Sequence, residues 1–375
     1  MADGAGQTVP SAKTFKSMAQ FIVRRLFLLL PVLIGILLVT FIIVRLIPGD
    51  PCVVMLGEKA TQEKCDAFKE RYGLNDNVIV QFGRYLFNMA KGDLGISIRF
   101  GRPVADLIAE RLPLTIELTF GAMIFSTVAG ILLGVVSALK RNSPIDTITM
   151  VIANIGISMP VFWLGLMLAY FFAITLKDTF FQLPPSSRLT AGMSLASLDK
   201  LWLIENPAGA QRFILDFFSN SLFVNSIITG KWEIFWDGVK HLILPCIAVG
   251  TIPMAIIARM TRSSLLEVLG LEYIRTARAK GLTFAKVINK HAMRNAMIPI
   301  VTIIGIETGA LLSGAVLTET VFALPGVGTA TVQAILARDY PVVQGFTLII
   351  GIIFIVVNLV VDVSYAYLDP RIRLD

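Results

Sequence analysis

The chain has 375 residues, of which 55% are hydrophobic and only 16% are charged, and its formal net charge is +7. Soluble domains average roughly 45–50% apolar and about 25% charged residues, so this composition indicates a membrane protein whose basic residues mark cytoplasmic loops, not a nucleic-acid-binding protein. Three cysteines and two histidines exclude a disulfide-rich scaffold and a dense Cys/His metal cluster.

Six long apolar stretches predict helices that cross the bilayer, because roughly 30 Å of hydrocarbon requires about 20 mostly apolar residues. The first follows a short basic segment, but it is too long for a signal-peptide core, so we interpret it as a retained helix. Pro160 lies inside the third stretch, and Pro245 and Pro253 break the fourth. The predicted transmembrane helices are 26–46, 114–138, 148–175, 241–262, 296–322 and 343–366.

The distribution of basic residues predicts the orientation of these helices. With six spans, all short basic segments fall on one side, which the positive-inside rule makes cytoplasmic, together with both termini. The cytoplasmic segments are then the N-terminal segment 1–25, the Lys140–Arg141 turn, the basic loop 263–294 and the tail 367–375.

Two long segments, 47–113 and 176–240, are then expected at the outer face, and the first contains several helix-like runs. Residues 213–229 are apolar enough to suggest a seventh span, but Asp216, Asn220 and Asn225 each oppose insertion. On insertion scales an Asp at the centre of a span costs about 2.5–3.5 kcal/mol. We therefore predict an amphipathic or interfacial segment there. Cys52 and Cys65 lie in a compartment that permits a disulfide, and the alternative is two unpaired thiols.

The basic loop contains the most distinctive local pattern, EYIRTARAKGLTFAKVINKHAMRN over residues 272–295. Strong helix formers follow Glu272, and Gly281 favours a helix end in the left-handed conformation. Thr283 is placed to cap a second helix that leads into the fifth span.

This loop has two interpretations. Basic segments beside a membrane attract acidic lipids, so it would serve as a lipid anchor. The small residues Ala277, Ala279 and Gly281 instead favour close packing against another protein surface.

The stretch Glu272–Gly281, with Ile298–Pro299 downstream, resembles the EAA loop of ABC importer permeases. It is similar in particular to the dipeptide/oligopeptide/nickel group, although Tyr273 replaces the first alanine of the general pattern. Further motifs of that group occur in the same order along the chain. They are Pro48-Gly49-Asp50-Pro51, Lys91-Gly92-Asp93-Leu94-Gly95, Glu110-Arg111-Leu112-Pro113, Phe322–Gly328 and Asp369-Pro370-Arg371.

This resemblance implies an all-α polytopic membrane protein with six transmembrane helices in the MetI-like permease fold, a core domain of about 110–366 and helical outer-face insertions. It implies a permease subunit that forms half of the pathway for di- or oligopeptides in an ATP-driven importer. The expected partners are a second, homologous permease, two cytoplasmic ATPases, an outer binding protein and membrane lipid, in a bacterial or archaeal plasma membrane. The ATPase-coupling residues would be Glu272, Tyr273, Arg275, Thr276, Ala277, Ala279, Lys280 and Gly281.

The chain itself lacks a G-x-x-x-x-G-K-[ST] phosphate loop, so ATP and Mg²⁺ would be used by the partner ATPases. No nucleophile–base or metal constellation is present, and we expect neither enzymatic activity nor a cofactor or metal bound by this chain. The cargo stays open among dipeptides, oligopeptides, glutathione-like molecules and nickel complexes. His241 and His291 lie near loop ends and do not form a cluster, which argues against a nickel site.

Polar residues inside the spans suggest a conduit, since such groups usually face a bundle interior or a watery cavity. The candidates for the translocation pathway are Glu307, Asn154 and Asn358. For each polar position, including Glu117 and Glu319, the alternative is an interhelical hydrogen bond or a place near the membrane surface. The rival function is an ion-coupled secondary transporter in which Glu307 and Asp362 relay protons.

Overall fold

The structure is a computed structural model that describes residues 12–46, 52–53, 60–71 and 73–368. Within these ranges the chain is helical apart from loops and an isolated bridge between Ile96 and Pro103. The motifs predicted at 48–51 and 369–371 lie outside the described residues.

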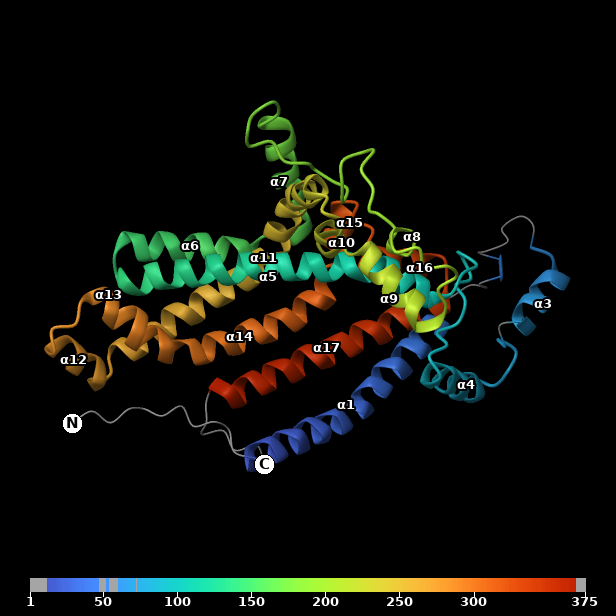
Figure 1. Ribbon diagram of the computed structural model, residues 1–375, viewed down its shortest axis with the longest axis horizontal. Coiled ribbons are helices and arrows are strands. Elements are labelled where there is room, and N and C mark those ends of the chain that lie inside the picture. Colours follow the sequence, from blue (N-terminus) through green and yellow to red (C-terminus); the bar gives the residue numbers. More distant parts are fainter. Residues whose placement is uncertain (1–11, 47–51, 54–59, 72, 369–375) are drawn as a thin grey trace.

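Long helices lie side by side in a tilted bundle (Figure 1). Helix α11 packs most extensively on α5 and then on α14, while α17 packs on both α1 and α14. These helices are α1 (Ala12–Leu46), α5 (Val104–Leu139), α11 (Trp232–Leu269), α14 (Met293–Gly314) and α17 (Tyr340–Leu368).

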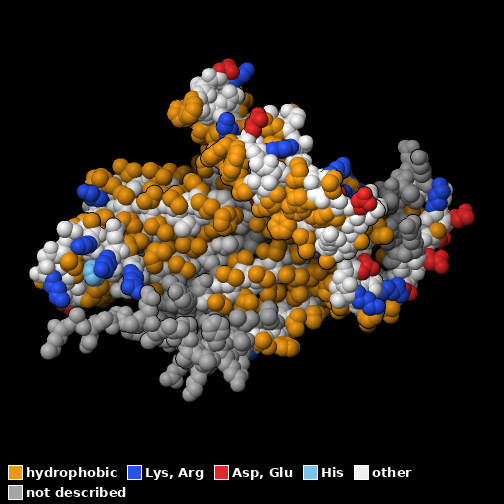
Figure 2. All heavy atoms as spheres, viewed as in Figure 1, with side chains coloured by type: hydrophobic (Ala, Val, Ile, Leu, Met, Phe, Trp, Pro, Cys, Tyr) orange, Lys and Arg blue, Asp and Glu red, His pale blue; other side chains and the backbone are white. Residues whose placement is uncertain are grey.

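The bundle exposes an apolar exterior. Large side chains such as Phe120, Leu132 and Val360 are more than half exposed. In Figure 2 hydrophobic side chains cover the middle of the visible face, whereas most charged side chains gather toward the two ends. In water this surface would be strongly unfavourable, so it indicates helices that contact lipid.

Four described helices, α1, α5, α11 and α17, contain stretches long and apolar enough to cross a membrane, and a bent pair raises the number to five. Among the described residues, the stretch predicted as the fifth span, 296–322, is not one of these helices. It is divided at Ala315 between α14 and the short α15 (Val316–Val321).

The bent pair lies at the predicted span 148–175, which contains Pro160. Helix α6 (Pro144–Ser158) ends at Met159, and α7 (Val161–Tyr170) with its continuation η2 (Phe171–Thr175) leaves at 108°. Met159 is extended, with φ −92° and ψ 133°, because Pro160 disfavours helical geometry in the preceding residue. In Figure 1 α6 runs along α5, and α7 projects away from the bundle.

Proline has the opposite outcome in α11, which continues through Pro245 and Pro253 without a break. This helix begins at Trp232 and α5 begins at Val104, both well before the predicted spans at 241 and 114. Apolarity predicts only the stretch of a helix suited to lipid, whereas backbone hydrogen bonding continues past it, so both helices are longer than their apolar stretches.

Close approach of α5 and α11 depends on glycine. A Cβ atom on Gly130 would lie 2.8 Å from the Met254 carbonyl oxygen, and one on Gly134 would lie 2.6 Å from that of Ala258. These two glycines are one helical turn apart on α5, a small-xxx-small spacing that lets helix backbones meet in a membrane.

The two ends of the bundle carry different elements (Figure 1). At one end lie α12 (Glu272–Ala279) and α13 (Phe284–Lys286), which continue through η3 (Val287–Ala292) into α14. Short helices of the segments 47–113 and 176–240, here called the first and second insertions, lie toward the other end, together with α16 (Val327–Leu336). The insertion helices are α3 (Gln62–Arg71), α4 (Val78–Ala90), α8 (Leu198–Leu201), α9 (Gly209–Asn220) and α10 (Leu222–Thr229).

The region 213–229 does not form a continuous helix. Helices α9 and α10 meet at Ser221, whose backbone is extended, and each is too short to cross a bilayer. The structure therefore agrees with the prediction of no seventh span at this position.

Candidate functional site

Helix α12 of the basic loop is anchored by a narrow apolar face. Ile274 is fully buried and Ala277 is 6% exposed, and both join the core cluster that contains Leu265 and Val287. The small side chain of Ala277 therefore serves packing within this chain. This differs from the expectation that it clears space for a partner.

The remaining face of α12 is open to solvent. Arg275 pairs with Glu272 at 2.8 Å between Nη1 and Oε1, and both side chains are mostly exposed. The Thr276 hydroxyl donates to the Glu272 carbonyl oxygen at 3.2 Å. The exposed side chains of this surface belong to Glu272, Tyr273, Arg275, Thr276, Arg278, Ala279, Lys280 and Phe284.

Gly281 forms the turn between α12 and α13 with a φ of +74°, which L residues with a side chain rarely adopt. No atom lies within 4 Å of the position that a Cβ would take, so the requirement for glycine comes from the backbone and not from crowding within this chain. Thr283 precedes α13 as predicted, but its side chain makes no capping hydrogen bond.

Tyr273 connects α12 to the start of α14. Asn295 Nδ2 donates to the Tyr273 hydroxyl at 2.6 Å, and that hydroxyl lies 3.4 Å from the His291 carbonyl oxygen, to which it donates. Ser264 on α11 adds a further link by donating to the Ala296 carbonyl oxygen at 3.1 Å. The exposed basic surface thus rests on a support that joins α11, α12 and α14.

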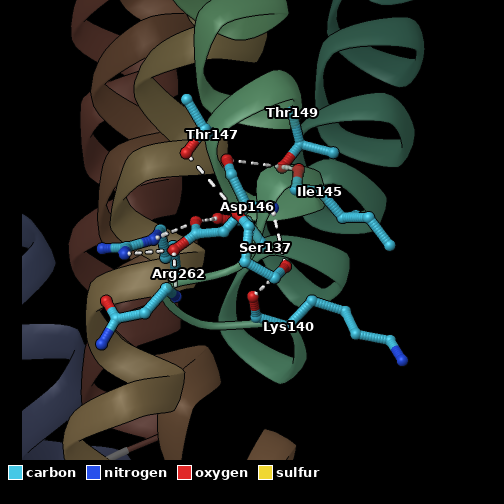
Figure 3. Close-up of polar contacts among 9 residues, drawn as sticks. Ser137, Lys140, Ile145, Asp146, Thr147, Thr149 and Arg262 are labelled. Atoms are coloured by element: carbon cyan, nitrogen blue, oxygen red, sulfur yellow. Dashed lines mark hydrogen bonds and ion pairs between the residues drawn. The ribbon is translucent and has the colours of Figure 1, made fainter.

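A polar cluster between α5, α6 and α11 holds the same end of the bundle together (Figure 3). Arg262 donates through Nε to Asp146 Oδ1 at 2.9 Å and through Nη2 to Oδ2 at 2.8 Å. The Ser137 hydroxyl also donates to Asp146, as does the Asn142 backbone N–H at 3.0 Å. The α5–α6 turn is thereby fixed to the helix that leads into the basic loop.

Sequence reasoning did not identify this cluster. Ser143 followed by Pro144 is a recognisable helix start, and the Ser143 hydroxyl accepts the Asp146 N–H at 3.3 Å. That signal locates Asp146 in the first turn of α6, but it does not reveal that Arg262, more than a hundred residues later, is its partner.

No hydrogen bond or ion pair of the described residues joins the three pathway candidates to one another. Asn358 on α17 donates to the Phe354 carbonyl oxygen of its own helix at 2.9 Å, and it lies beside Gly309 of α14. Glu307 on α14 is half-buried and has no ion pair with the described residues. Asn154 is exposed on α6, whose main contacts are with α5 and α11. The side chain of Asp362 lies outside those that the structure describes.

Glu117 and Glu319 have structural partners. Glu117 pairs with Arg188 of the second insertion at 2.7 Å, with both side chains largely buried, and accepts the Phe223 N–H at 3.2 Å. Glu319 is fully buried and accepts from the Thr115 hydroxyl at 2.6 Å and from the Thr329 N–H at 3.0 Å. These contacts correspond to the alternative of hydrogen bonding between elements.

The glycines of the Phe322–Gly328 motif make room for the Glu319 carboxylate. A Cβ on Gly326 would overlap it, and one on Gly328 would lie 2.9 Å from Oε2. The carboxylate sits at the N-terminus of α16, where backbone N–H groups favour a negative charge.

Cys52 and Cys65 are joined by a disulfide, with Cα atoms 5.4 Å apart, and both residues are buried. The bridge belongs to the insertion at the end opposite the basic loop. Among the described residues no group of three His, Cys, Asp or Glu side chains is arranged to hold a metal ion.

Two family models match the chain and together extend over most of its length. Residues 130–374 match the model of the binding-protein-dependent transport system inner membrane component, and residues 18–119 match its N-terminal membrane component.

Curated relatives are similar over nearly the whole chain. The dipeptide transport system permease protein DppB of Alkalihalophilus pseudofirmus is 46% identical over 95% of this chain and 100% of its own length. The protein of the same name from Escherichia coli is 45% identical over 95% of this chain and 99% of its own length. A probable D,D-dipeptide transport system permease protein of Escherichia coli, DdpB, is 40% identical over 91% of this chain and 94% of its own length.

Proposed function

This chain belongs to the family of binding-protein-dependent transport inner membrane components, and from that membership we propose that it carries short peptides, with dipeptides as the primary cargo, across the bacterial inner membrane. It is a permease subunit of an ABC importer, and ATP hydrolysis belongs to a separate subunit. The observation that carries the cargo proposal is the 44–46% identity, over 95% of the chain, to permeases named for dipeptide or di/tripeptide transport.

We further propose that the complete importer contains a second, homologous permease, two cytoplasmic ATPases that use ATP and Mg²⁺, and an outer binding protein. The side chains of Asn154, Glu307 and Asn358 are exposed or half-buried, which supports a pathway shared with a second permease, because polar groups within a bilayer usually face a cavity or another polypeptide. In this proposal the chain crosses the membrane six times, with both termini in the cytoplasm.

The basic loop is proposed as the contact with the ATPases. Its support is an exposed, positively charged surface around Gly281 that rests on the buried residues Ile274 and Ala277. A rigid attachment to α11 and α14 would transmit a displacement of the loop to membrane helices. The insertions at the opposite end, including the bridge between Cys52 and Cys65, would then lie outside and face the binding protein.

Reconstituted uptake tests this proposal. Proteoliposomes that contain both permeases and both ATPases should accumulate dipeptide only when ATP is inside and the binding protein is outside. Replacing Arg278 and Lys280 by glutamate should abolish uptake, while the matched outer-face change Lys200→Glu should leave the ATPase contact intact. Uptake that follows a proton gradient and ignores ATP would instead favour the rival secondary transporter.

A further inference from the structure

A polar cavity of about 480 Å³, here called the outer pocket, lies at the end of the bundle opposite the basic loop. The end of α1, helix α4 and the start of α17 line it. Among its lining residues, Gln344 is buried and Arg45 and Tyr85 are half-buried, whereas Glu70 and Asp93 are exposed to solvent. Its volume falls within the roughly 300–1,000 Å³ of typical small-molecule sites.

Arg45 lies in this pocket without an acidic partner among the described residues. Its Nε and Nη2 donate to Gln81 Oε1 at 3.1 and 2.9 Å, and Nη1 donates to the Phe41 carbonyl oxygen at 3.3 Å. The guanidinium also stacks 3.4 Å from the centre of the Phe41 ring. All these partners are neutral, so two of its five N–H groups and its full charge are left for a ligand.

The other arginine of the pocket is not equivalent. Arg84 Nη2 lies 2.7 Å from Asp76 Oδ2, so its charge already has a partner. A planar guanidinium that is partly withdrawn from water binds a carboxylate most strongly, through two parallel hydrogen bonds. Arg45 is therefore the position in the outer pocket where an anion would be most stabilised.

Two further groups beside Arg45 are suited to an anion. Gln344 is only 5% exposed, and its Nε2 has no hydrogen-bond partner among the described residues. Leaving a buried donor unpaired is unfavourable, so native structures rarely do so without a ligand or water. The Tyr85 hydroxyl donates only a long hydrogen bond, at 3.5 Å, to the Gln344 carbonyl oxygen, and burial raises the pKa of Tyr85 to about 12, which keeps the hydroxyl protonated.

We propose that the outer pocket binds the free C-terminal carboxylate of a short peptide, with Arg45 as its charged partner and Gln344 and Tyr85 as additional donors. The exposed carboxylates of Glu70 and Asp93 line the same cavity and suit the ammonium group of a peptide zwitterion. This inference rests on the proposed peptide cargo and adds a receiving site on the permease itself, at the ends of the apolar helices α1 and α17 that lie opposite the basic loop.

Binding measurements on the assembled importer in nanodiscs of zwitterionic lipid, without the binding protein, test this site. The probes are dialanine and dialanine amide, which lacks the carboxylate, and calorimetry gives each Kd. We expect the amide to bind about tenfold or more weakly, because a bidentate charge-assisted pair is lost. Arg45→Gln should weaken dialanine to the level of the amide and leave amide binding unchanged.

Two variants separate the site from general effects on folding. Tyr85→Phe removes one donor and keeps the ring, and it should weaken dialanine by about tenfold, as expected for loss of one hydrogen bond to a charged group. Arg212→Gln removes an exposed arginine of α9 that does not line the pocket and is paired with Asp106 at 3.1 Å, and it should have no effect on dialanine. Equal affinity for dialanine and its amide, or no effect of Arg45→Gln, would overturn the inference.

Lipid competition and uptake measurements distinguish failure of this site from failure of the proposed function. If added phosphatidylglycerol binds the wild type but not Arg45→Gln, and excludes dialanine, the anion is a lipid phosphate and the peptide site is refuted. If ATP-dependent dipeptide uptake persists with an unchanged KM in Arg45→Gln, the proposed function stands and only this site falls. Absence of any ATP-dependent uptake by the wild-type importer would contradict the proposed function itself.

Discussion

Arg262 of α11 donates hydrogen bonds to both carboxylate oxygens of Asp146 of α6, from Nε to Oδ1 at 2.9 Å and from Nη2 to Oδ2 at 2.8 Å. The Asp146 side chain is 8% exposed and that of Arg262 is 30% exposed. The pair joins the turn after α5 to the helix that enters the basic loop, so it holds in register the elements that would carry force from the ATPases.

Asp146→Asn should lower the stability of the importer by about 2 kcal/mol. Breaking one partner of a buried pair is strongly unfavourable, but the partial exposure of Arg262 reduces the effect. Thermal unfolding in detergent measures it. In a double-mutant cycle with Arg262→Gln, a coupling energy of about 1–3 kcal/mol is expected, and additive effects would contradict the pairing.

Gly326→Ala should destabilise the chain by about 1–3 kcal/mol, because the added methyl group overlaps the buried Glu319 carboxylate. Backbone strain is not involved, since φ at Gly326 is −94°. The matched control is Gly83→Ala on α4, which has no neighbour within 4 Å and should stabilise its helix by about 0.5–1 kcal/mol. Equal melting temperatures for the two variants would exclude the steric account.

Loss of the Cys52–Cys65 bridge should loosen the first insertion. In the chain-entropy model a bridge between residues 13 apart stabilises by about 3 kcal/mol. Cys65→Ser should accelerate tryptic cleavage within α3, at Lys64 or Lys69, and reductant should make the wild type equally sensitive. Cys246→Ala serves as the control, because that cysteine is unbridged and buried elsewhere. Insensitivity of wild-type cleavage to reductant would argue against a stabilising bridge.

Gly281→Trp should abolish ATPase association while changing the stability of the permease by only about 1–2 kcal/mol. The open space around Gly281 accommodates the indole, and the strain arises from the φ of +74° alone. Gly281→Asn is the matched control, since asparagine tolerates this conformation better, and it should retain association. Co-purification with the ATPases measures the difference, and normal recovery of the tryptophan variant would contradict the docking proposal.

Patterns within short stretches predicted much of this architecture. Apolar length located the helices, and the turn at Gly281 has the left-handed conformation that glycine favours. The outcome at proline was not predictable from local sequence. The chain leaves the helical conformation before Pro160, whereas α11 continues through Pro245. Tertiary packing decides whether a carbonyl group that loses its hydrogen bond to a proline is accommodated.

Pairings between distant residues were also beyond local sequence. Side-chain hydrogen bonds join Asp146 to Arg262, Glu117 to Arg188 and Glu319 to Thr115, and the partners of each pair are more than seventy residues apart in the chain. A carboxylate in a span has the same sequence signature whether it lines a pathway or anchors a loop. The three-dimensional arrangement distinguishes the two roles only where the partner lies in the same chain, as it does for Glu117 and Glu319.

The most direct test of the proposed mechanism is site-specific crosslinking in the assembled importer. A photoreactive group attached through Lys280→Cys, in a Cys246→Ala background, should label an ATPase subunit, and the yield should change when ATP is added. The same group attached through Lys200→Cys, in the second insertion, should label only the binding protein or lipid. Labelling of the binding protein from position 280, or of lipid alone, would contradict a cytoplasmic coupling role for the basic loop.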